Sequence, residues 1–216
     1  MSGFVNEQRR ELLQQILDLR TRYLTVVLED IYQTQNASAV VRSAECLGLR
    51  EIHIIENRNE YQINPKVVKG SSKWIKIKRY NNSNNNTENC LASLKQKEYK
   101  IVAMTLNEDA ILLDQLSLED KTALCFGSED TGLSSIANKM TDYHIKVPMC
   151  GFTQSFNISV SAGIALYSLS DKLRRSTNNW QLESNEKDDL YLEWLVKSTP
   201  NGRLLLKNFL EKVVIN

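Results

Sequence analysis

Short, continuously apolar runs are the most regular feature of this chain. Each run is four or five residues long and lacks the strict polar alternation of a strand with one solvent-exposed face. Strands that are buried on both faces have this pattern, which is typical of parallel sheets. The expected strands cover residues 24–28, 52–55, 100–104, 122–126 and 143–147.

Helical patterns alternate with these strands. Apolar residues recur at helical spacing in residues 37–47, 88–97 and 133–140, and the segment after Gly163 continues as a helix to about Arg175. Strands that alternate with helices in this way form parallel sheets covered by helices. The sequence therefore predicts the α/β fold class, with a mainly parallel sheet and flanking helices.

Further helices are expected at both ends of the chain. Residues 7–22 predict an amphipathic helix with an arginine-bearing outer face, and residues 188–197 and 204–214 give two more helical patterns, separated by a turn-rich segment. We therefore expect three parts: a basic N-terminal helix in residues 1–22, a central α/β domain in residues 23–175, and a helical tail in residues 176–216.

One expected strand has a different pattern of apolar and polar residues. In residues 74–79, Ile75 and Ile77 alternate with Lys76 and Lys78, which predicts a strand with one basic, solvent-exposed face. No acid occurs between Lys66 and Arg79, so this segment is able to meet phosphate although the net charge of the chain is only +1. The asparagine-rich residues 81–86 are expected to form a solvated loop.

The composition narrows the remaining possibilities. The 216 residues are 42% hydrophobic, contain no apolar run near the roughly 20 residues of a membrane span, and begin without a signal-peptide pattern, so we expect a cytoplasmic protein. The four cysteines have no metal-ligand spacing and are expected to be buried free thiols. Only two histidines are present, so a histidine-based metal site is not expected.

Three segments carry candidate chemistry. Asn36 is placed to cap a helix that carries Arg42 nearly two turns further on, although a capped helix with a surface arginine is the simpler explanation of this pair taken alone. Residues 126–134 form a strand-to-helix crossing with two glycines, which permit close backbone approach. Residues 147–159 run from an apolar strand end through an uncharged, glycine-containing loop to a helix of small residues. Such a loop offers backbone groups to a ligand.

In this order, the three segments resemble the motifs of the SpoU/TrmH family of SPOUT RNA 2'-O-methyltransferases. The first motif is matched by Asn36, Ser38 and Arg42. The second is matched by Phe126, Gly127, Glu129, Gly132, Leu133 and Ser134. The third is matched by Val147, Pro148, Met149, Gly151, Ser155, Asn157 and Ser159, with Phe156 and Ile158 replacing the usual Leu and Val.

Within this family the chain is most similar to the enzymes that methylate guanosine 18 in the D-loop of tRNA. The similarity rests on the basic N-terminal helix, the segment 25–30, the segment Gly70-Ser-Ser-Lys-Trp74 and the helical tail. The resemblance implies a deep C-terminal trefoil knot, a homodimer, S-adenosylmethionine as cofactor, and tRNA as partner. Two alternatives stay open: methylation of rRNA or of another tRNA position, and an RNA-binding assembly factor without catalysis.

The resemblance also assigns roles to residues. The family proposal makes the first-motif arginine a general base, but its pKa is too high for that role, so we instead expect Arg42 to grip the phosphate beside the target ribose. Asn36 positions Arg42 or the ribose, and Ser155 bonds Arg42 or the RNA. The catalytic set is Arg42, Asn36, Glu129 and Asn157. The expected cofactor set is Thr105, Leu106, Asn107, Gly127, Val147, Met149, Gly151, Ser155, Phe156 and Asn157, although Met149 and Phe156 would also suit a packed core. The expected RNA-binding set is Arg9, Arg10, Arg20, Arg22, Lys73, Lys76 and Lys78.

Overall fold

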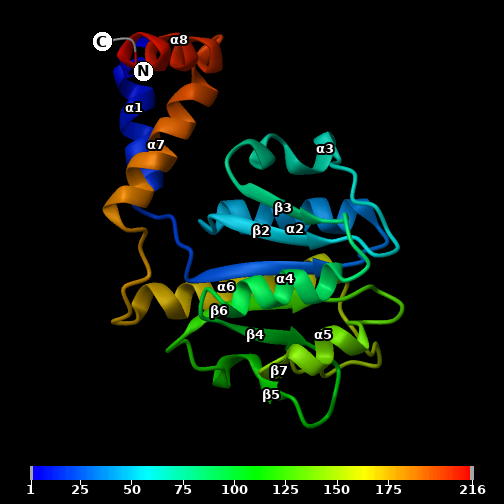
Figure 1. Cartoon of the computed structure of the whole chain (residues 1–216). Helices are drawn as coiled ribbons and strands as arrows, with labels where there is room; N and C mark the ends of the chain where they lie inside the picture. The colour runs from blue at the N-terminus through cyan, green and yellow to red at the C-terminus, as the bar shows by residue number, and fades with distance from the viewer. Residues whose placement is uncertain (1, 215–216) are drawn as a thin grey trace. The chain divides into compact units, whose positions relative to one another are not determined.

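A sheet of seven strands, in which every strand pair is parallel, forms the centre of residues 21–180 (Figure 1). The structure is a computed structural model that describes residues 2–214. The strands are β1 (Leu24–Glu29), β2 (Glu51–Ile55), β3 (Lys76–Tyr80), β4 (Tyr99–Met104), β5 (Ile111–Leu112), β6 (Lys121–Phe126) and β7 (Tyr143–Lys146). The predicted parallel α/β architecture is therefore confirmed, and β5 is the one strand that the apolar pattern missed.

The strand order creates a switch point in the middle of the sheet. Across the sheet the order is β3-β2-β1-β6-β4-β7-β5, so the chain builds one side from β1 outward and then returns to the other side of β1. Loops that follow the two central strands diverge from each other at such a point. Ligands of open parallel sheets bind there, beyond the carboxyl ends of the strands.

Helices cover both faces of the sheet because successive strand residues point in opposite directions. Val26 joins the larger apolar core, which is shared with α2 (Thr34–Cys46) and α6 (Ile158–Arg175). Its neighbour Val27 joins the smaller core, shared with α4 (Asn86–Lys95) and α5 (Ser135–Met140). All six residues of β1 are buried, which explains why apolar residues dominate its sequence.

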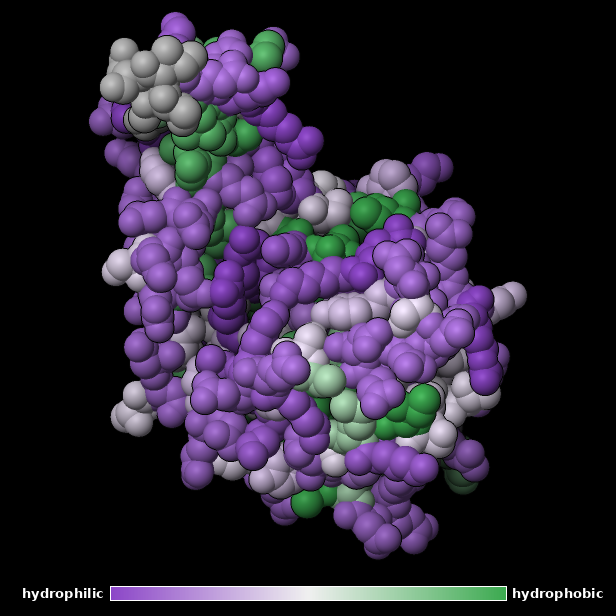
Figure 2. Space-filling view, in the orientation of Figure 1, coloured by the Kyte–Doolittle hydropathy of each residue, from purple (hydrophilic) through white to green (hydrophobic). Residues whose placement is uncertain are grey.

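Among the described residues, 2–20 and 181–214 form a compact unit distinct from residues 21–180. Within the smaller unit, α1 (Glu7–Leu17) packs on α7 (Ser184–Ser198), and α7 packs on α8 (Gly202–Val214). Apolar side chains also reach the surface of this unit (Figure 2), and α8 exposes Leu204, Phe209 and Leu210. No helix among residues 2–214 is long and apolar enough to cross a membrane.

Several local expectations need correction. The first helix ends at Leu17, and Arg20 is buried with its guanidinium 5.2 Å from the Trp194 ring centroid, so it does not lie on an outer face. Asn36 is not the helix cap, because α2 begins at Thr34 after Gln33. Asn86 is buried at the start of α4, where its side chain donates to the Glu56 carbonyl, so it does not belong to a solvated loop.

The cysteines are free, as expected, but only two are buried. Cys90 and Cys125 lie in the smaller core, whereas Cys46 and Cys150 are exposed. Burial raises the pKa of the Cys90 thiol to about 12, so this group behaves as a small apolar side chain.

Candidate cofactor and catalytic site

A cavity of about 640 Å³ lies at the carboxyl ends of β4, β6 and β7. This volume is in the range of pockets that hold a nucleoside-sized ligand. The loops that form its wall are those that the sequence analysis singled out, and Gln33 and Asn36 at the start of α2 complete it. From the expected cofactor set, the lining includes Thr105, Leu106, Asn107, Gly127, Val147, Met149, Ser155, Phe156 and Asn157.

Gly127 is required by the shape of the second motif. The loop folds back after β6, and the Gly132 amide donates to the Ser128 carbonyl at 2.8 Å. A Cβ atom on Gly127 would lie 2.0 Å from the Gly132 carbonyl carbon, far inside van der Waals contact. Gly132 itself has a φ of 65°, which favours glycine. The two glycines therefore let the loop bring its backbone close to the cavity.

Hydrogen bonds join the three motifs at the cavity. The Asn36 Nδ2 donates to Gln33 Oε1 at 3.2 Å and to Glu129 Oε1 at 2.7 Å. The Asn36 Oδ1 accepts from Asn157 Nδ2 at 3.1 Å. Asn157 in turn caps α6, because its Oδ1 accepts from the Ser159 amide at 2.9 Å. Residues from three distant segments are thus linked by one continuous series of hydrogen bonds, from Glu129 through Asn36 to Asn157, which we call the polar line.

Two further contacts hold the first motif in place. The second carboxylate oxygen of Glu129 accepts from the Tyr32 amide at 3.1 Å, just before α2 begins. The buried Ser38 hydroxyl lies 3.3 Å from the Tyr61 hydroxyl and accepts from the Asn64 amide at 3.1 Å. A small polar residue is needed at position 38 because the loop after β2 packs directly against the helix.

Arg42 lies outside the lining of the cavity. It is exposed on α2, and its guanidinium Nη1 lies 3.5 Å from the Val67 carbonyl in α3 (Pro65–Val68). Among residues 2–214 it makes no hydrogen bond to Asn36 or Ser155, so the expected contacts with these two side chains are not seen. Gly151 is likewise outside the cavity lining, although its loop contributes other residues.

Glu29 is a site residue that the sequence analysis missed. Its carboxylate is 2% exposed and accepts hydrogen bonds from the Ser134 amide at 2.8 Å, the Ser134 hydroxyl at 2.8 Å and the Thr87 hydroxyl at 2.5 Å. The Ser134 hydroxyl also caps α5 by accepting from the Ala137 amide. Glu29 thereby fixes the end of the second motif to the end of β1. The feature of the sequence that could have indicated this role is an acid at the end of an otherwise largely apolar strand.

The bases of the expected RNA-binding set are placed in different environments. Lys73 and Lys76 are exposed, as is Arg22, while Arg9 and Arg10 are partly buried on α1. Lys78 is paired with Glu51, with a 2.7 Å distance between Nζ and Oε2. Lys76 and Lys78 lie on one face of β3, and Ile77 and Arg79 lie on the other.

The environment of Lys78 is a buried polar cluster. Glu51 is buried, but hydrogen bonds from His53 and Lys78 outweigh the desolvation and hold its pKa well below the usual range. The buried His53 lies 3.3 Å from Glu51 through Nε2 and 3.1 Å from the Tyr80 hydroxyl through Nδ1, and burial lowers its pKa. His53 is therefore a structural residue. No group of three or more potential metal ligands is found among residues 2–214.

Fold and site together define a class of protein. A parallel sheet whose strand order switches beside a ligand-sized cavity, with glycine-rich backbone at the cavity wall, is typical of α/β proteins that bind a nucleotide-like molecule. A comparison of the sequence with known families then gives the family. Residues 23–167 match the SpoU rRNA Methylase family, so the chain belongs to this family.

Individual relatives agree with this assignment. The chain is 42% identical over 205 residues to a tRNA (guanosine(18)-2'-O)-methyltransferase of Borreliella burgdorferi, covering 95% of this chain and 92% of the relative. The crystal structure of the A. aeolicus TrmH/SpoU tRNA modifying enzyme superposes with a TM-score of 0.69 at 26% identity, covering 97% and 98% of the two chains.

A more distant structure shares the fold. The SpoU methyltransferase AviRb from Streptomyces viridochromogenes, solved in complex with the cofactor AdoMet, has a TM-score of 0.59 at 18% identity, over 75% of this chain and 62% of that one. At this identity the likeness concerns the fold. The sequence-based assignment to the SpoU/TrmH family is confirmed by the family match and by the Borreliella relative.

Proposed function

We propose that this protein methylates the ribose 2'-hydroxyl of guanosine 18 in the D-loop of tRNA, with S-adenosylmethionine as methyl donor. The observation that carries the proposal is the polar line from Glu129 through Asn36 to Asn157, which joins the three family motifs at the cavity. The Borreliella relative, which bears this activity in its name, aligns over nearly the whole length of both chains. The similarity to this relative therefore extends over both the helical tail and the central domain.

The cavity fits the cofactor. An adenosyl group needs apolar walls for its rings and hydrogen-bonding groups for its edges. Leu106, Val147 and Phe156 offer apolar surface, and the loops at 105–107 and 127–133 bring backbone groups to the wall. The close backbone packing at Gly127 leaves no space for a side chain there. When bound, S-adenosylmethionine supplies a sulfonium methyl group that is open to attack by the ribose oxygen.

We assign the alignment of the ribose to Asn36, Glu129 and Asn157. Asn36 is 8% exposed and uses both amide hydrogens and its oxygen in the polar line, so its orientation is fixed. Alignment of a nucleophile with its donor can supply several kcal/mol of the barrier reduction. The catalytic role of these residues therefore lies in holding the mouth of the cavity in one geometry.

Arg42 has a different role in the proposal. Its guanidinium lies outside the cavity lining, on the exposed side of α2. We assign it to the phosphate beside the target ribose, where a bidentate contact stabilises the charge that develops on the 2'-oxygen. That phosphate or a water molecule then accepts the proton.

The proposal includes a homodimer, in which the second copy completes the site. On α6, Val160, Ile164 and Tyr167 are exposed at a spacing that places them on one helix face, and Phe152 and Phe156 are exposed in the preceding loop. Phe156 also lines the cavity, and an exposed apolar face of this kind suits a second copy of the chain. The position of Arg42 outside the cavity lining supports a site that draws Arg42 from the other copy.

A mixing experiment tests the shared site. Copies with Arg42→Ala are unfolded and refolded together with copies carrying Gly127→Ala, which disables the cofactor loop. If each site combines one chain's cavity with the other chain's Arg42, random pairing restores about a quarter of the wild-type activity. Sites built within one chain would restore none. Sedimentation of the wild-type protein establishes whether it is a dimer.

Three finer assignments are also part of the proposal. The trefoil knot is expected where the segments that follow β6 and β7 form the cavity wall, as in the family that the sequence resembles. Residues 23–175 carry the reaction, while the basic residues of the N-terminal segment 1–22 contribute to tRNA binding. We place the protein in the cytoplasm, a reducing compartment that suits its free thiols.

Mapping the methylated nucleotide tests the activity itself. The purified protein is incubated with labelled S-adenosylmethionine and a tRNA transcript, a transcript with guanosine 18 replaced, or rRNA. We expect one ribose methyl group at guanosine 18 and none in the replaced transcript. Methylation of rRNA or of another position would support the corresponding alternative, and absence of cofactor binding would support a non-catalytic RNA-binding protein.

A further inference from the structure

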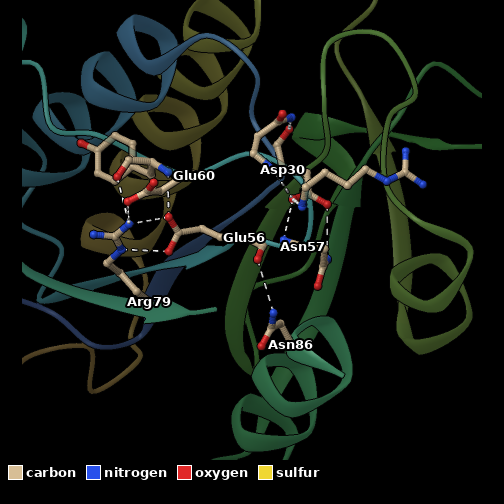
Figure 3. A network of polar contacts seen from close by, with 9 residues as sticks. Asp30, Glu56, Asn57, Glu60, Arg79 and Asn86 are labelled. Atoms are coloured by element: carbon tan, nitrogen blue, oxygen red, sulfur yellow. Dashed lines mark hydrogen bonds and ion pairs between the residues drawn. The ribbon is translucent and has the colours of Figure 1, made fainter. Parts of the chain in front are cut away.

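The loop after β2 is held by an acid that no motif includes. Asp30 follows β1 directly, and its Oδ1 accepts from the amides of Asn57 and Arg58 at 2.7 and 2.8 Å, with a longer contact of 3.3 Å from the Asn59 amide. The Asn59 side chain returns a bond to the Asp30 carbonyl at 2.8 Å. Figure 3 shows Asp30 and Asn57 facing each other across this turn.

The backbone of Asp30 is itself unusual. Its φ of 52° lies in the left-handed region, which non-glycine residues seldom adopt. The contacts with residues 57–59 hold it there. Asn57 also donates to Thr87, whose hydroxyl bonds Glu29, so the loop is tied to the same buried carboxylate as the second motif. The loop is therefore presented in one conformation beside the cavity loops.

Arg58 is the residue that this arrangement presents. It is exposed, and among residues 2–214 its guanidinium has no hydrogen-bond or ion-pair partner. The acids nearby in the sequence are engaged elsewhere: Glu56 pairs with Arg79 at 2.8 and 2.5 Å, and Glu60 lies 3.7 Å from the same guanidinium. Figure 3 shows this Glu56–Arg79 group apart from the Asp30–Asn57 contact.

Arg58 lies at the same end of the sheet as the cavity, beyond the carboxyl ends of the strands. The cavity lies beyond β4, β6 and β7, the Asn36 segment follows β1, and the Arg58 loop follows β2 at the same carboxyl edge. Adjacent strands are about 4.8 Å apart, so β2 is roughly 10 Å from β6. This separation suits a nucleotide next to the one whose ribose faces the cavity.

We propose that Arg58, held by the Asp30 carboxylate, binds a phosphate of the RNA strand that flanks the target nucleotide. This inference rests on the proposed function and names a contact for its substrate. An arginine whose charge is not compensated within the described chain, on a loop with a fixed backbone, offers a planar pair of donors to phosphate. Asp30 acts as the positioning residue, because its Oδ1 accepts from backbone amides and its Oδ2 from the Asn57 side-chain amide, which leaves the guanidinium available.

Arg58→Ala tests the contact, with Lys100→Ala as the matched control. Lys100 also carries one positive charge and lies near the amino end of β4, at the opposite end of the sheet from the cavity. Its Nζ lies 3.9 Å from Asp120 Oδ2. We expect Arg58→Ala to weaken tRNA binding about tenfold and to reduce the slope of log affinity against log salt by about 0.7–1. Affinity for S-adenosylmethionine, measured by calorimetry, stays unchanged. Lys100→Ala changes tRNA affinity less than about twofold.

Asp30→Ala tests the positioning role. If Asp30 acts through Arg58, the single variants and the double variant weaken tRNA binding to a similar extent, because the second change removes nothing further. Additive losses would contradict the link between the two residues. Arg58→Lys is expected to recover only part of the affinity, since a lysine lacks the planar pair of donors.

The outcomes separate the inference from the proposed function. A wild-type protein that methylates tRNA, combined with an Arg58→Ala variant that matches Lys100→Ala in affinity and salt slope, overturns the Arg58 contact alone. A wild-type protein that neither binds nor methylates tRNA overturns both. Because the Arg58 side chain is exposed, its removal leaves the fold intact, and circular dichroism of the variant verifies this.

Discussion

The Asn36 Nδ2 donates a 2.7 Å hydrogen bond to the Glu129 Oε1, although the two residues are 93 positions apart in the sequence. The bond joins the first turn of α2, which follows β1, to the loop after β6, on either side of the switch point. Asn36 uses its second amide hydrogen for Gln33 Oε1, and its oxygen accepts from Asn157 Nδ2. Its orientation is therefore set by both neighbouring loops.

The first prediction concerns this pair. Asn36→Asp places a second carboxylate within hydrogen-bond distance of Glu129, and two such groups cannot both be ionised at low cost. We expect kcat/KM to fall about 100-fold at pH 8 and to recover in part toward pH 5.5, where one shared proton removes the repulsion. A pH profile of methyl transfer measures this.

Two comparison variants sharpen the result. Asn36→Ala should lose activity without recovering it at low pH, since it adds no carboxylate. The double variant Asn36→Asp with Glu129→Gln exchanges donor and acceptor and should regain activity at pH 8. Equal pH profiles for Asn36→Asp and Asn36→Ala would contradict the proposed contact between the two side chains in solution.

A second prediction concerns Glu29. Glu29→Gln replaces one acceptor oxygen by a donor that faces the Ser134 and Thr87 groups, so buried hydrogen bonds are lost. We expect the free energy of unfolding to fall by about 1–3 kcal/mol and the KM for S-adenosylmethionine to rise. Urea unfolding and initial rates provide the two readouts. Glu88→Gln, on the exposed side of α4, is the control and should change neither value.

The strands could be predicted from the sequence because a strand that is buried on both faces has a continuous run of apolar residues. Each of the five apolar runs became a parallel strand, and the basic alternation in residues 74–79 became the edge strand β3. The two-residue β5 left no such trace, because Ile111 and Leu112 are too few to form a pattern. The strand order depends on contacts between distant segments and could not be derived from periodicity.

The site was predictable to the extent that its loops have motifs. Nine residues of the expected cofactor set line the cavity, and the structure shows why Gly127 must be glycine. The role of Asn36 was misread as a helix cap, because its true partners lie in other loops. Arg20 was misplaced for a similar reason: a charged residue beside a helical pattern gives no sign of the Trp194 ring that covers it. Assignments of RNA-binding and catalytic roles stay predictions.

A third prediction uses two glycines of the cofactor motifs. Gly127→Ala would force the second-motif loop apart, since the new Cβ would meet the Gly132 backbone at 2.0 Å. We expect a loss of S-adenosylmethionine affinity of tenfold or more, about 1.4 kcal/mol, measured by calorimetry. At Gly151 the nearest atom to a new Cβ is 4.0 Å away. Gly151→Ala should therefore keep its affinity, and a comparable loss there would return Gly151 to the cofactor set.

A fourth prediction follows from the buried His53. Its pKa is lowered in the folded protein, so the unfolded chain binds a proton more readily below its usual pKa of about 6.5. The stabilising contribution is complete above that pH and is lost as the pH falls from about 6.5 toward the lower pKa of the folded state. Urea unfolding at pH 7.5 and 5.5 should show this loss. His53→Gln should reduce the difference between the two pH values, and an unchanged difference would exclude His53 as its source.

A fifth prediction separates two lysines that the sequence grouped together. Lys73 is exposed beside Trp74, whereas Lys78 pairs with the buried Glu51 at 2.7 Å. Lys73→Ala should weaken tRNA binding and flatten its salt dependence without affecting stability. Lys78→Ala should instead lower the free energy of unfolding by about 1–3 kcal/mol, because it removes a hydrogen-bond partner from a buried carboxylate. Filter binding at several salt concentrations and urea unfolding distinguish the two. Loss of tRNA affinity in a fully stable Lys78→Ala variant would show that the ion pair opens to meet the RNA.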